Sequence, residues 1–288
     1  MKCVSYNIQY GIGLDGRYDI ARIADAVRGA DVIALQEVTR NNPKNGGRDM
    51  VAELRDALPD YFAVFGPNFE ADLGSSLKDG RVVDVYFQFG NMVLAKKPIH
   101  VSRNLLLPRR RSFDKLNLQR GALEALVETE FGPVRFYSVH LDHRDPDERL
   151  EQVRFLRERV FNYALEGGAL TGLSELGLPE PPFPESYVLM GDFNMLAGAD
   201  EYLALAGRED PSMGMPLSAA RAVDCAAHVA GETAATTWVE PKDPKDKSLH
   251  KRIDYAFASP DLAPRLKSSR VDQAAVGSDH QPLWVEFG

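Results

Sequence analysis

The sequence predicts an α+β sandwich, in which sheets pack against each other and helices cover them. Strand-like segments occur in the middle of the chain and again at its end, and helical segments separate only some of them. This order favours a sandwich over a regularly alternating α/β sheet. The 288 residues contain no low-complexity tract and no repeat of fixed period, and a chain of this length can bury one large core. We therefore expect residues 1–288 to form a single domain.

The first predicted elements form a strand–helix–strand unit. Apolar and polar side chains alternate over residues 2–8, and residues 31–37 include adjacent β-branched side chains, so both segments are predicted strands. Between them, residues 19–27 have apolar side chains at helical spacing, and Asp19 is in place to cap the helix. A second helix is expected over residues 50–58.

The middle of the chain predicts several strands and one long helix. The strands are expected over residues 61–65, 90–95, 121–129, 134–140 and 187–190. Asp145 can cap the helix, Pro146 suits its first turn, and Glu148 stands at the capping-box position. The apolar stripe of this helix is Leu150, Val153, Leu156 and Val160.

Two loops and two strands complete the pattern. Residues 167–186 are rich in Gly and Pro, which indicates a surface excursion rather than a linker, because strand patterns resume directly after it. Residues 241–251 form a second excursion, which is polar and carries four lysines. Late strands are expected over residues 252–258 and 282–286, and Trp238 and Trp284 are interpreted as core aromatics.

Charge and cysteine content narrow the class of protein. The 34 Lys and Arg residues against 42 Asp and Glu residues give a net charge of -8, which argues against broad, charge-driven wrapping of nucleic acid. The only cysteines, Cys3 and Cys225, are far apart, as expected for reduced thiols. We see no transmembrane segment, signal peptide or exposed apolar hairpin of the kind a membrane-lipid enzyme needs. The prediction is a cytoplasmic protein, with no protein partner implied.

Polar and ionisable residues gather where the predicted strands end. Asn7, Glu37 and His140 each close a strand pattern, and the remaining candidates are Asp192, Asn194, Asp254, Asp279 and His280. Alone, each has an ordinary explanation as a turn former, a helix cap, a surface carboxylate or a buried ion-pair partner. Together they are what hydrolytic metal chemistry requires of a rigid scaffold. If the strand geometry continues past residue 190, Asp192 and Asn194 project on the same face.

These residues stand in an ordered series of motifs, namely SYNI, LQEV, GNMVLAKKPI, QRGALEALV, SVHLDH, GDFN, KRIDYAFAS and GSDHQPL. The series resembles the endonuclease/exonuclease/phosphatase superfamily, which includes deoxyribonuclease I-like nucleases, neutral sphingomyelinases and inositol-polyphosphate phosphatases. It spans residues 5–284, and GDFN followed by RIDY and SDH, after an LQE, is its most specific part. The resemblance implies a four-layer α/β sandwich, with two packed, mostly antiparallel sheets, helices on the outer faces, and a site at one end of the sheets.

The resemblance also implies a metal site. Glu37 is similar to the principal Mg²⁺ carboxylate of the superfamily, with Asn7 close by and Asp279 as a further ligand. Oxygen donors with room for water suit Mg²⁺, or Mn²⁺ in its place. The sequence contains no Cys/His cluster of the kind that binds structural zinc.

Catalytic roles follow from the same resemblance. Asp192 is expected to orient or deprotonate the attacking water, and Asn194 to help place that water and the phosphoryl oxygens. His280 is expected to donate to a non-bridging phosphate oxygen, while Asp254 orients its ring. His140 resembles a histidine that supports the transition state or protonates the leaving oxygen, and it counts against the abasic-site DNA-repair branch.

The predicted function is a Mg²⁺-dependent phosphoester hydrolase, either a phosphodiesterase or a phosphatase, acting on a small molecule or a nucleic acid. The alternatives are an endonuclease or exonuclease on DNA or RNA, and a superfamily member that only binds. The stretch 108–111, with Phe113, Lys115 and Arg120, is either a phosphate-binding surface or a solvated loop. Residues 142–144 are interpreted as polar loop residues rather than ligands.

Overall fold

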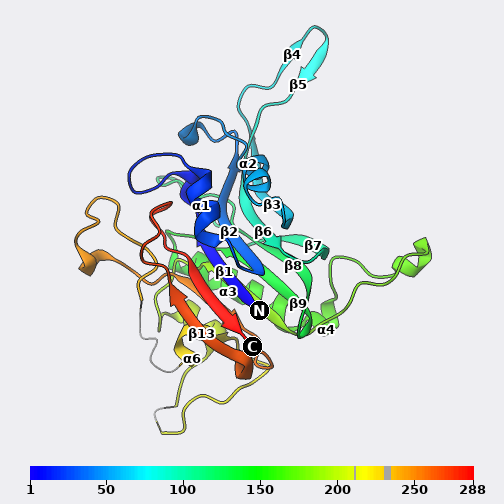
Figure 1. Ribbon diagram of the computed structural model, residues 1–288, viewed down its shortest axis with the longest axis vertical. Coiled ribbons are helices and arrows are strands. Elements are labelled where there is room, and N and C mark those ends of the chain that lie inside the picture. The colour runs from blue at the N-terminus through cyan, green and yellow to red at the C-terminus, as the bar shows by residue number, and fades with distance from the viewer. Residues whose placement is uncertain (211, 230–234) are drawn as a thin grey trace.

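Two six-stranded sheets form the centre of the computed structural model, which describes residues 1–210, 212–229 and 235–288 (Figure 1). The first sheet has the order β13-β14-β1-β2-β6-β3, and the second has the order β11-β12-β10-β9-β8-β7. The strands of the first sheet are β1 (Lys2–Asn7), β2 (Val32–Arg40), β3 (Phe62–Asp72), β6 (Tyr86–Ala95), β13 (Leu266–Val271) and β14 (Leu283–Phe287). Those of the second are β7 (Ile99–Leu106), β8 (Gly121–Thr129), β9 (Gly132–His140), β10 (Tyr187–Asp192), β11 (Val223–Asp224) and β12 (Asp254–Ala258).

Each sheet contains one parallel pair of strands, and this pair brings the site residues to one end of the molecule. β1 runs parallel to β2, and β9 runs parallel to β10, whereas the other paired strands are antiparallel. Parallel neighbours end at the same edge of a sheet. The predicted arrangement of two mostly antiparallel sheets is therefore confirmed.

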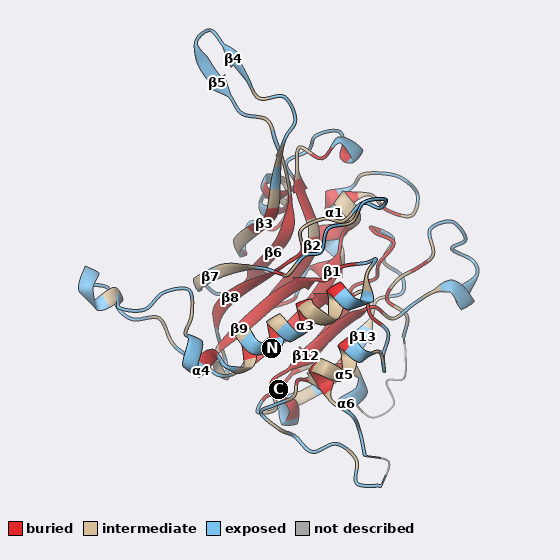
Figure 2. Cartoon of the chain, turned by 180° about the vertical axis from the view of Figure 1, so that it is seen from behind, coloured by how far each residue is buried: buried red, intermediate tan, exposed pale blue. Residues whose placement is uncertain are grey.

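Helices cover the outer faces of the sheets, as predicted, with one exception (Figure 2). The helices are α1 (Ile20–Val27), α2 (Met50–Ala57), α3 (Pro146–Phe161), α4 (Tyr163–Glu166), α5 (Asp200–Ala206) and α6 (Cys225–His228). The exception is α6, which packs between the edges of the two sheets, where Cys225 joins the core. None of the described helices has both the length and the apolar character needed to span a membrane.

Three buried apolar clusters hold the four layers together. One lies between the sheets and includes Val93 and Phe136. A second joins α1 and α2 to the first sheet, and a third joins α3 and α5 to the second sheet. Because alternate side chains of a strand point to opposite faces, each central strand contributes to two clusters.

Aspartates cap α1, α2 and α3, and two of them, Asp19 and Asp145, stand at predicted cap positions. The side chains of Asp19, Asp49 and Asp145 accept hydrogen bonds from the first-turn amides of α1, α2 and α3. The capping-box interpretation of Glu148 is wrong, because its buried carboxylate accepts from the backbone N–H of Arg110 at 2.9 Å. Glu148 therefore holds the 108–118 loop instead of the start of its own helix.

Several strands lie outside the predicted pattern because their side chains are polar or only partly buried. β7 and β13 were not predicted, and both contain charged residues along an exposed edge of their sheet. A hairpin of β4 (Ser76–Lys78) and β5 (Arg81–Val83) also projects from the sandwich (Figure 1). Leu77 and Val82 on it are 73% and 68% exposed, so the expectation that the chain has no exposed apolar hairpin is wrong.

The excursion at residues 167–186 lies away from the predicted site. It leaves the fold after α4, projects from the sandwich (Figure 1), and returns at Tyr187, the first residue of β10. Asp192 is at the other end of β10. The loop is a surface excursion, as predicted, and it does not cover the site.

Gly191 permits the close approach of β9 and β10 next to Asp192. A Cβ at this position would lie 1.9 Å from the carbonyl oxygen of Val139, its register partner. We expect Gly191→Ala to lower the free energy of unfolding by more than about 3 kcal/mol, because backbone atoms of two buried strands must separate. Urea denaturation measures this loss.

Gly132→Ala is the matched control for this substitution. Gly132 has φ +93° and open space where its Cβ would stand, so only backbone strain opposes the change. That strain costs about 1–2 kcal/mol. An equal loss of stability in the two variants would contradict the role assigned to Gly191.

Candidate active site

A cavity of about 800 Å³ opens at the ends of β9 and β10 and collects most of the predicted site residues. Of these residues, its walls include Glu37, His140, Asp192, Asn194, Asp279 and His280. The other two stand directly behind it, since Asn7 donates to Asp192 and Asp254 bonds to His280. The structure thus brings all eight together, and their individual roles remain predictions.

Asn7 ties the end of β1 to the end of β10. Its Nδ2 donates to Oδ2 of Asp192 at 3.0 Å, and its Oδ1 accepts from the backbone N–H of Gln9 at 3.1 Å. Both Asn7 and Asp192 are buried. Because the two strands belong to different sheets, this hydrogen bond sets the position of Asp192 across the sandwich.

Glu37 reaches the cavity through an irregularity in β2. The strand continues to Arg40, three residues past its predicted end, and its register against β6 shifts between Leu35 and Val38. Glu37 itself has φ +60°, which is uncommon for a residue with a side chain. Strained residues and bulges of this kind re-aim side chains at functional sites.

The GDFN segment turns instead of continuing the strand. β10 ends at Asp192, and Asn194 has φ +49°, so the extended geometry supposed for this pair is wrong. The backbone N–H of Asn194 donates to Oδ1 of Asp192 at 3.0 Å, which forms an Asx-turn. Asn194 Nδ2 donates to the carbonyl of Leu141 at 3.1 Å. Both side chains still line the cavity.

His280 and Asp254 form a buried pair next to Asp192. Nδ1 of His280 lies 2.8 Å from Oδ2 of Asp254, and Nε2 lies 3.7 Å from Oδ2 of Asp192. Burial lowers the pKa of His280, but the carboxylates of Asp254 and Asp192 outweigh burial and raise that pKa to about 10. His280 is therefore protonated at neutral pH and can donate from Nε2 into the cavity.

Trp238 belongs to the site, so its interpretation as a core aromatic is wrong. It is only partly buried and lines the cavity, and its Nε1 donates to Oδ2 of Asp279 at 3.1 Å. Trp284 is buried in the core, as predicted. The sequence around Trp238 gives no sign that its ring N–H holds a carboxylate 41 positions later in the chain.

The carboxylates of the site fit a divalent cation. Burial raises the pKa of Glu37, and the nearby charge of Asp279 raises it further. Burial likewise raises the pKa of Asp192, while the charge of His280 opposes that shift. Burial and mutual repulsion both disfavour the charged form of these carboxylates, and a bound cation would stabilise that form. Hard oxygen donors of this kind suit Mg²⁺. Asp192, Asp254 and His280 also converge within 4.8 Å, but the hydrogen bond between Asp254 and His280 already occupies part of this group.

Arg120 and His143 also line the cavity. The sequence placed Arg120 on a possible phosphate-binding surface, but the interpretation of His143 and Arg144 as loop residues did not place them in the cavity wall. Arg120 is buried, and its two terminal nitrogens lie 2.7 Å from Nε2 of His140 and 2.7 Å from Nδ1 of His143. His140 Nε2 is also 3.5 Å from Asp192. Burial, followed by the charge of Arg120, places the pKa of His140 well below its usual value, so its ring is neutral. The signal available was the Arg of QRGALEALV, which stands one residue before β8.

The predicted basic surface divides into two parts. Arg120 lines the cavity, where it is joined by Lys251 from the polar excursion at residues 241–251. Arg110 is instead engaged on the outside, where it pairs with Asp147 and Glu151 of α3. Phe113 is 84% exposed and contacts Arg111 through its ring face.

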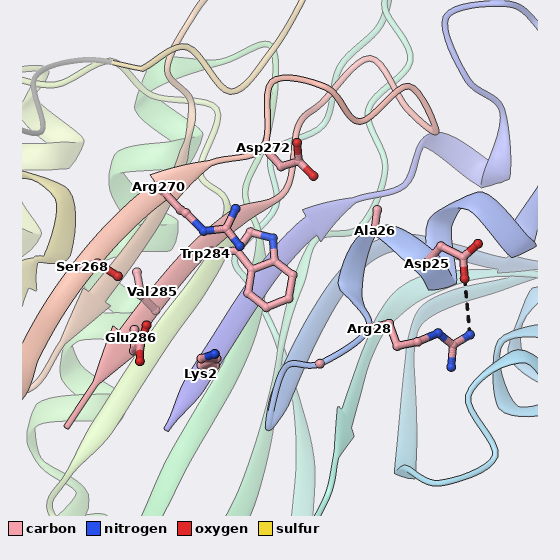
Figure 3. Close-up of a pocket in the computed structure, with 11 residues that line it drawn as sticks. Lys2, Asp25, Ala26, Arg28, Ser268, Arg270, Asp272, Trp284, Val285 and Glu286 are labelled. Carbon is pink, nitrogen blue, oxygen red and sulfur yellow. Dashed lines mark hydrogen bonds and ion pairs between the residues drawn. The ribbon is translucent and has the colours of Figure 1, made fainter.

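A different cavity of about 360 Å³ lies beside β1, β13 and β14 (Figure 3). Its walls mix basic and acidic side chains, and Arg270 lies over the ring of Trp284. Among the described residues that form these walls, none is one of the eight predicted site residues. The larger cavity is therefore the candidate active site.

Comparisons with known proteins agree with this fold. A sequence model of the endonuclease/exonuclease/phosphatase family matches residues 4–280. An endonuclease/exonuclease/phosphatase from Beutenbergia cavernae shares 21% identity and a TM-score of 0.66, over 100% of this chain and 72% of that one. A mannosyl-6-phosphatase from Bacteroides thetaiotaomicron shares 18% identity and a TM-score of 0.64, over 100% and 99% of the two chains.

A third solved structure is a 3′ phosphatase from Neisseria bound to a product DNA hairpin. It shares 20% identity and a TM-score of 0.58, over 100% of this chain and 99% of that one. No curated protein matches the chain. At these identities the structural matches demonstrate the shared fold.

The pair of His280 and Asp254 predicts a specific pH dependence in metal-free protein. The folded-state pKa of about 10 is above the ordinary value of 6.5. The pair therefore stabilises the fold fully below pH 6.5, and this contribution disappears as the pH rises toward 10. Asp254→Asn should lower the pKa of His280 and flatten this part of the stability profile. NMR titration of the imidazole, with His280→Gln to assign its signal, measures the shift. An unchanged pKa in Asp254→Asn would contradict the pairing.

Proposed function

The chain belongs to the endonuclease/exonuclease/phosphatase family, a family of phosphoester hydrolases, and from this premise we propose that it is a Mg²⁺-dependent phosphoester hydrolase. The observation that carries the proposal is the surroundings of Asp192. Its carboxylate is held by Asn7 and the Asn194 backbone, and two histidines face it at 3.5 and 3.7 Å. This arrangement suits a base that acts on water beside a phosphoryl group.

Asn7, Glu37 and Asp279 are the residues that we propose hold the Mg²⁺ ion. The bound ion would supply Lewis acidity at a phosphoryl oxygen and balance the negative charge of the reacting group. Trp238 fixes one oxygen of Asp279 by its hydrogen bond. A partner of this kind orients a ligand and supports metal affinity.

Asp192 accepts a proton from the attacking water, whose oxygen forms a bond to phosphorus as the ester P–O bond breaks. The leaving oxygen takes up a proton from solvent water in the open cavity. Burial raises the pKa of Asp192, which makes it a better base than an exposed carboxylate. Asn194, in the same cavity, helps to place the water. Holding water and phosphoryl group in line lowers the barrier by several kcal/mol, with roughly 7–11 kcal/mol reached in well-oriented model reactions.

His280 donates from Nε2 to a non-bridging phosphate oxygen, while Asp254 holds its Nδ1 at 2.8 Å. Arg120 adds a fixed positive charge next to His140. Donors and charges already in place stabilise the negative charge that develops in the transition state. We further propose that residues 1–288 form one catalytic domain that works in the cytoplasm, where the buried free thiols of Cys3 and Cys225 stay reduced.

Two other functions remain in competition with this one. A nuclease on DNA or RNA would use the same chemistry on a longer substrate. A binding protein without catalysis would be expected to lack one of the residues around Asp192, and all of them are present. The completeness of the set favours the enzyme.

Asp192→Asn tests the proposed base. With Mg²⁺ present, wild type is expected to hydrolyse at least one member of a panel that contains a chromogenic phosphodiester, its monoester, a sugar 6-phosphate, 3′-phosphorylated DNA, supercoiled DNA, RNA and sphingomyelin. Asp192→Asn should lower kcat by about 10²-fold or more and change KM little, because the lost interaction acts in the transition state. Asp84→Asn, on the exposed hairpin linker, is the matched control and should keep full activity. A fully active Asp192→Asn enzyme would reject the assignment.

Glu37→Gln tests the metal site separately from turnover. Removing one charged oxygen ligand should weaken Mg²⁺ binding by about tenfold or more. Calorimetric titration of Mg²⁺ measures this directly, and the Mg²⁺ concentration that gives half-maximal activity should rise in parallel. Mg²⁺ binding that is equally tight in Glu37→Gln and wild type would place the metal elsewhere.

A further inference from the structure

The cavity has one basic wall that extends beyond the residues used in the proposed hydrolysis. Beyond His140, the wall is made by Arg120, His143, Arg144 and Arg149. Arg149 is neutralised by Glu201, whose Oε1 lies 2.9 Å from its Nε. Within the described part of the chain, neither Arg120 nor Arg144 has a carboxylate at salt-bridge distance. The chain has a net charge of -8, so two such arginines on the same wall are unusual. Together they favour binding of an anion.

His143 shows why this wall is incomplete without a ligand. Its Nδ1 faces Arg120 at 2.7 Å, and its Nε2 faces Nε of Arg144 at 2.9 Å. Both guanidinium groups are donors only, but a neutral imidazole has a single acceptor nitrogen. One of the two contacts therefore cannot be a hydrogen bond, and one guanidinium N–H is left without a protein acceptor at this contact.

The surroundings of His143 do not supply the missing acceptor. The one nearby carboxylate is Asp142, whose Oδ1 is buried without a hydrogen-bond partner but lies 3.9 Å from Nδ1 of His143, beyond hydrogen-bond distance. Its Oδ2 accepts the backbone N–H groups of Arg144 and Asp145, at 2.6 and 2.7 Å. Nε of Arg120 is also buried without a hydrogen-bond partner. Burial, followed by the charge of Arg120, lowers the pKa of His143 to about 4, so the ring stays neutral between the two arginines.

We propose that Arg120, His143 and Arg144 form a second anion subsite, which takes a further phosphate group of the same substrate molecule. The proposal rests on the hydrolase function proposed above, because the scissile phosphate occupies the region around Asp192. Arg120 connects the two regions, since one of its terminal nitrogens contacts His140 and the other contacts His143. Arg144 is exposed and can turn from His143 to the ligand.

An adjoining hollow can hold the part of the substrate beyond the second phosphate. Arg144 and Pro146 line both the main cavity and this hollow of about 290 Å³, whose other walls include Arg111 and Lys115. The hollow continues the basic surface away from Asp192. The substrate class is therefore a phosphoester with a second phosphate, supplied either by a small bisphosphate or by the neighbouring nucleotide of a single strand.

The test compares substrates that differ by one phosphate group. kcat/KM for phosphate release is measured for thymidine 3′,5′-bisphosphate, for the 3′- and 5′-monophosphates, and for a 3′-phosphorylated thymidine oligonucleotide of ten residues. Wild type should prefer the bisphosphate or the oligonucleotide over the monophosphates by about tenfold or more, the effect of one charge-assisted hydrogen bond. Which of the two is preferred identifies the source of the second phosphate.

Arg144→Gln should reduce this preference by about tenfold. Arg154→Gln is the matched control, because Arg154 is exposed on α3 and outside the cavity, and it should keep the wild-type preference. Equal kcat/KM for all substrates in wild type, or a preference unchanged in Arg144→Gln, would overturn the subsite and leave the proposed hydrolase intact.

Binding in EDTA separates a failure of the subsite from a failure of the hydrolase. If wild type releases no phosphate from any substrate, the proposed function fails on these compounds. The subsite is then judged by calorimetry with thymidine 3′,5′-bisphosphate and the monophosphates. Tighter binding of the bisphosphate that is lost in Arg144→Gln supports the subsite, and equal binding of all three nucleotides overturns it.

Discussion

The hydrogen bond from Asn7 to Asp192 joins the two sheets at the end where the site lies, and the arrangement of the site depends on it. Further buried hydrogen bonds cross the sandwich nearby. Gln36 Nε2 donates to Oγ of Ser138 at 2.9 Å, and Asn91 Nδ2 donates to the carbonyl of Ser138 at 2.9 Å. A buried polar group left without its hydrogen bond costs about 1–3 kcal/mol. Sliding one sheet over the other would break these hydrogen bonds and is therefore unfavourable. Farther from the site, the space between the sheets is filled by apolar side chains.

The same buried hydrogen bonds hold the site together although its carboxylates repel one another. Glu37, Asp279 and Asp192 are held near one another although burial raises the pKa of Glu37 and Asp192. The protonated ring of His280 compensates Asp192, and Trp238 supports Asp279. Strongly shifted pKa values and strained residues such as Glu37 are typical of functional sites. The stability of the surrounding fold offsets the free energy that such residues cost locally. The proposed Mg²⁺ would relieve the remaining repulsion between Glu37 and Asp279.

The electrostatics of the cavity differ from those of the whole chain. The net charge of -8 argues against broad binding to nucleic acid, yet Arg120 and Arg144 line one wall of the cavity. A concave surface concentrates the field of its own charges, so a few arginines can attract a phosphorylated substrate to an acidic protein. This contrast favours recognition of one or two phosphate groups at the cavity over contact with a long polyanion along the surface.

The sequence by itself determined the local elements and the identity of the polar residues at their ends. The central strands and the caps at Asp19 and Asp145 follow from short-range periodicity and side-chain chemistry. Only the tertiary structure decided how these groups face one another. It placed Trp238 on Asp279, Glu148 on the 108–118 loop, and Arg120 between His140 and His143. These contacts join residues between 20 and 41 positions apart in the chain, and the left-handed backbone of Glu37 and Asn194 breaks the periodicity on which the predictions depended. A local pattern records which side of a strand a residue occupies, but only the packing of two sheets decides what it meets there.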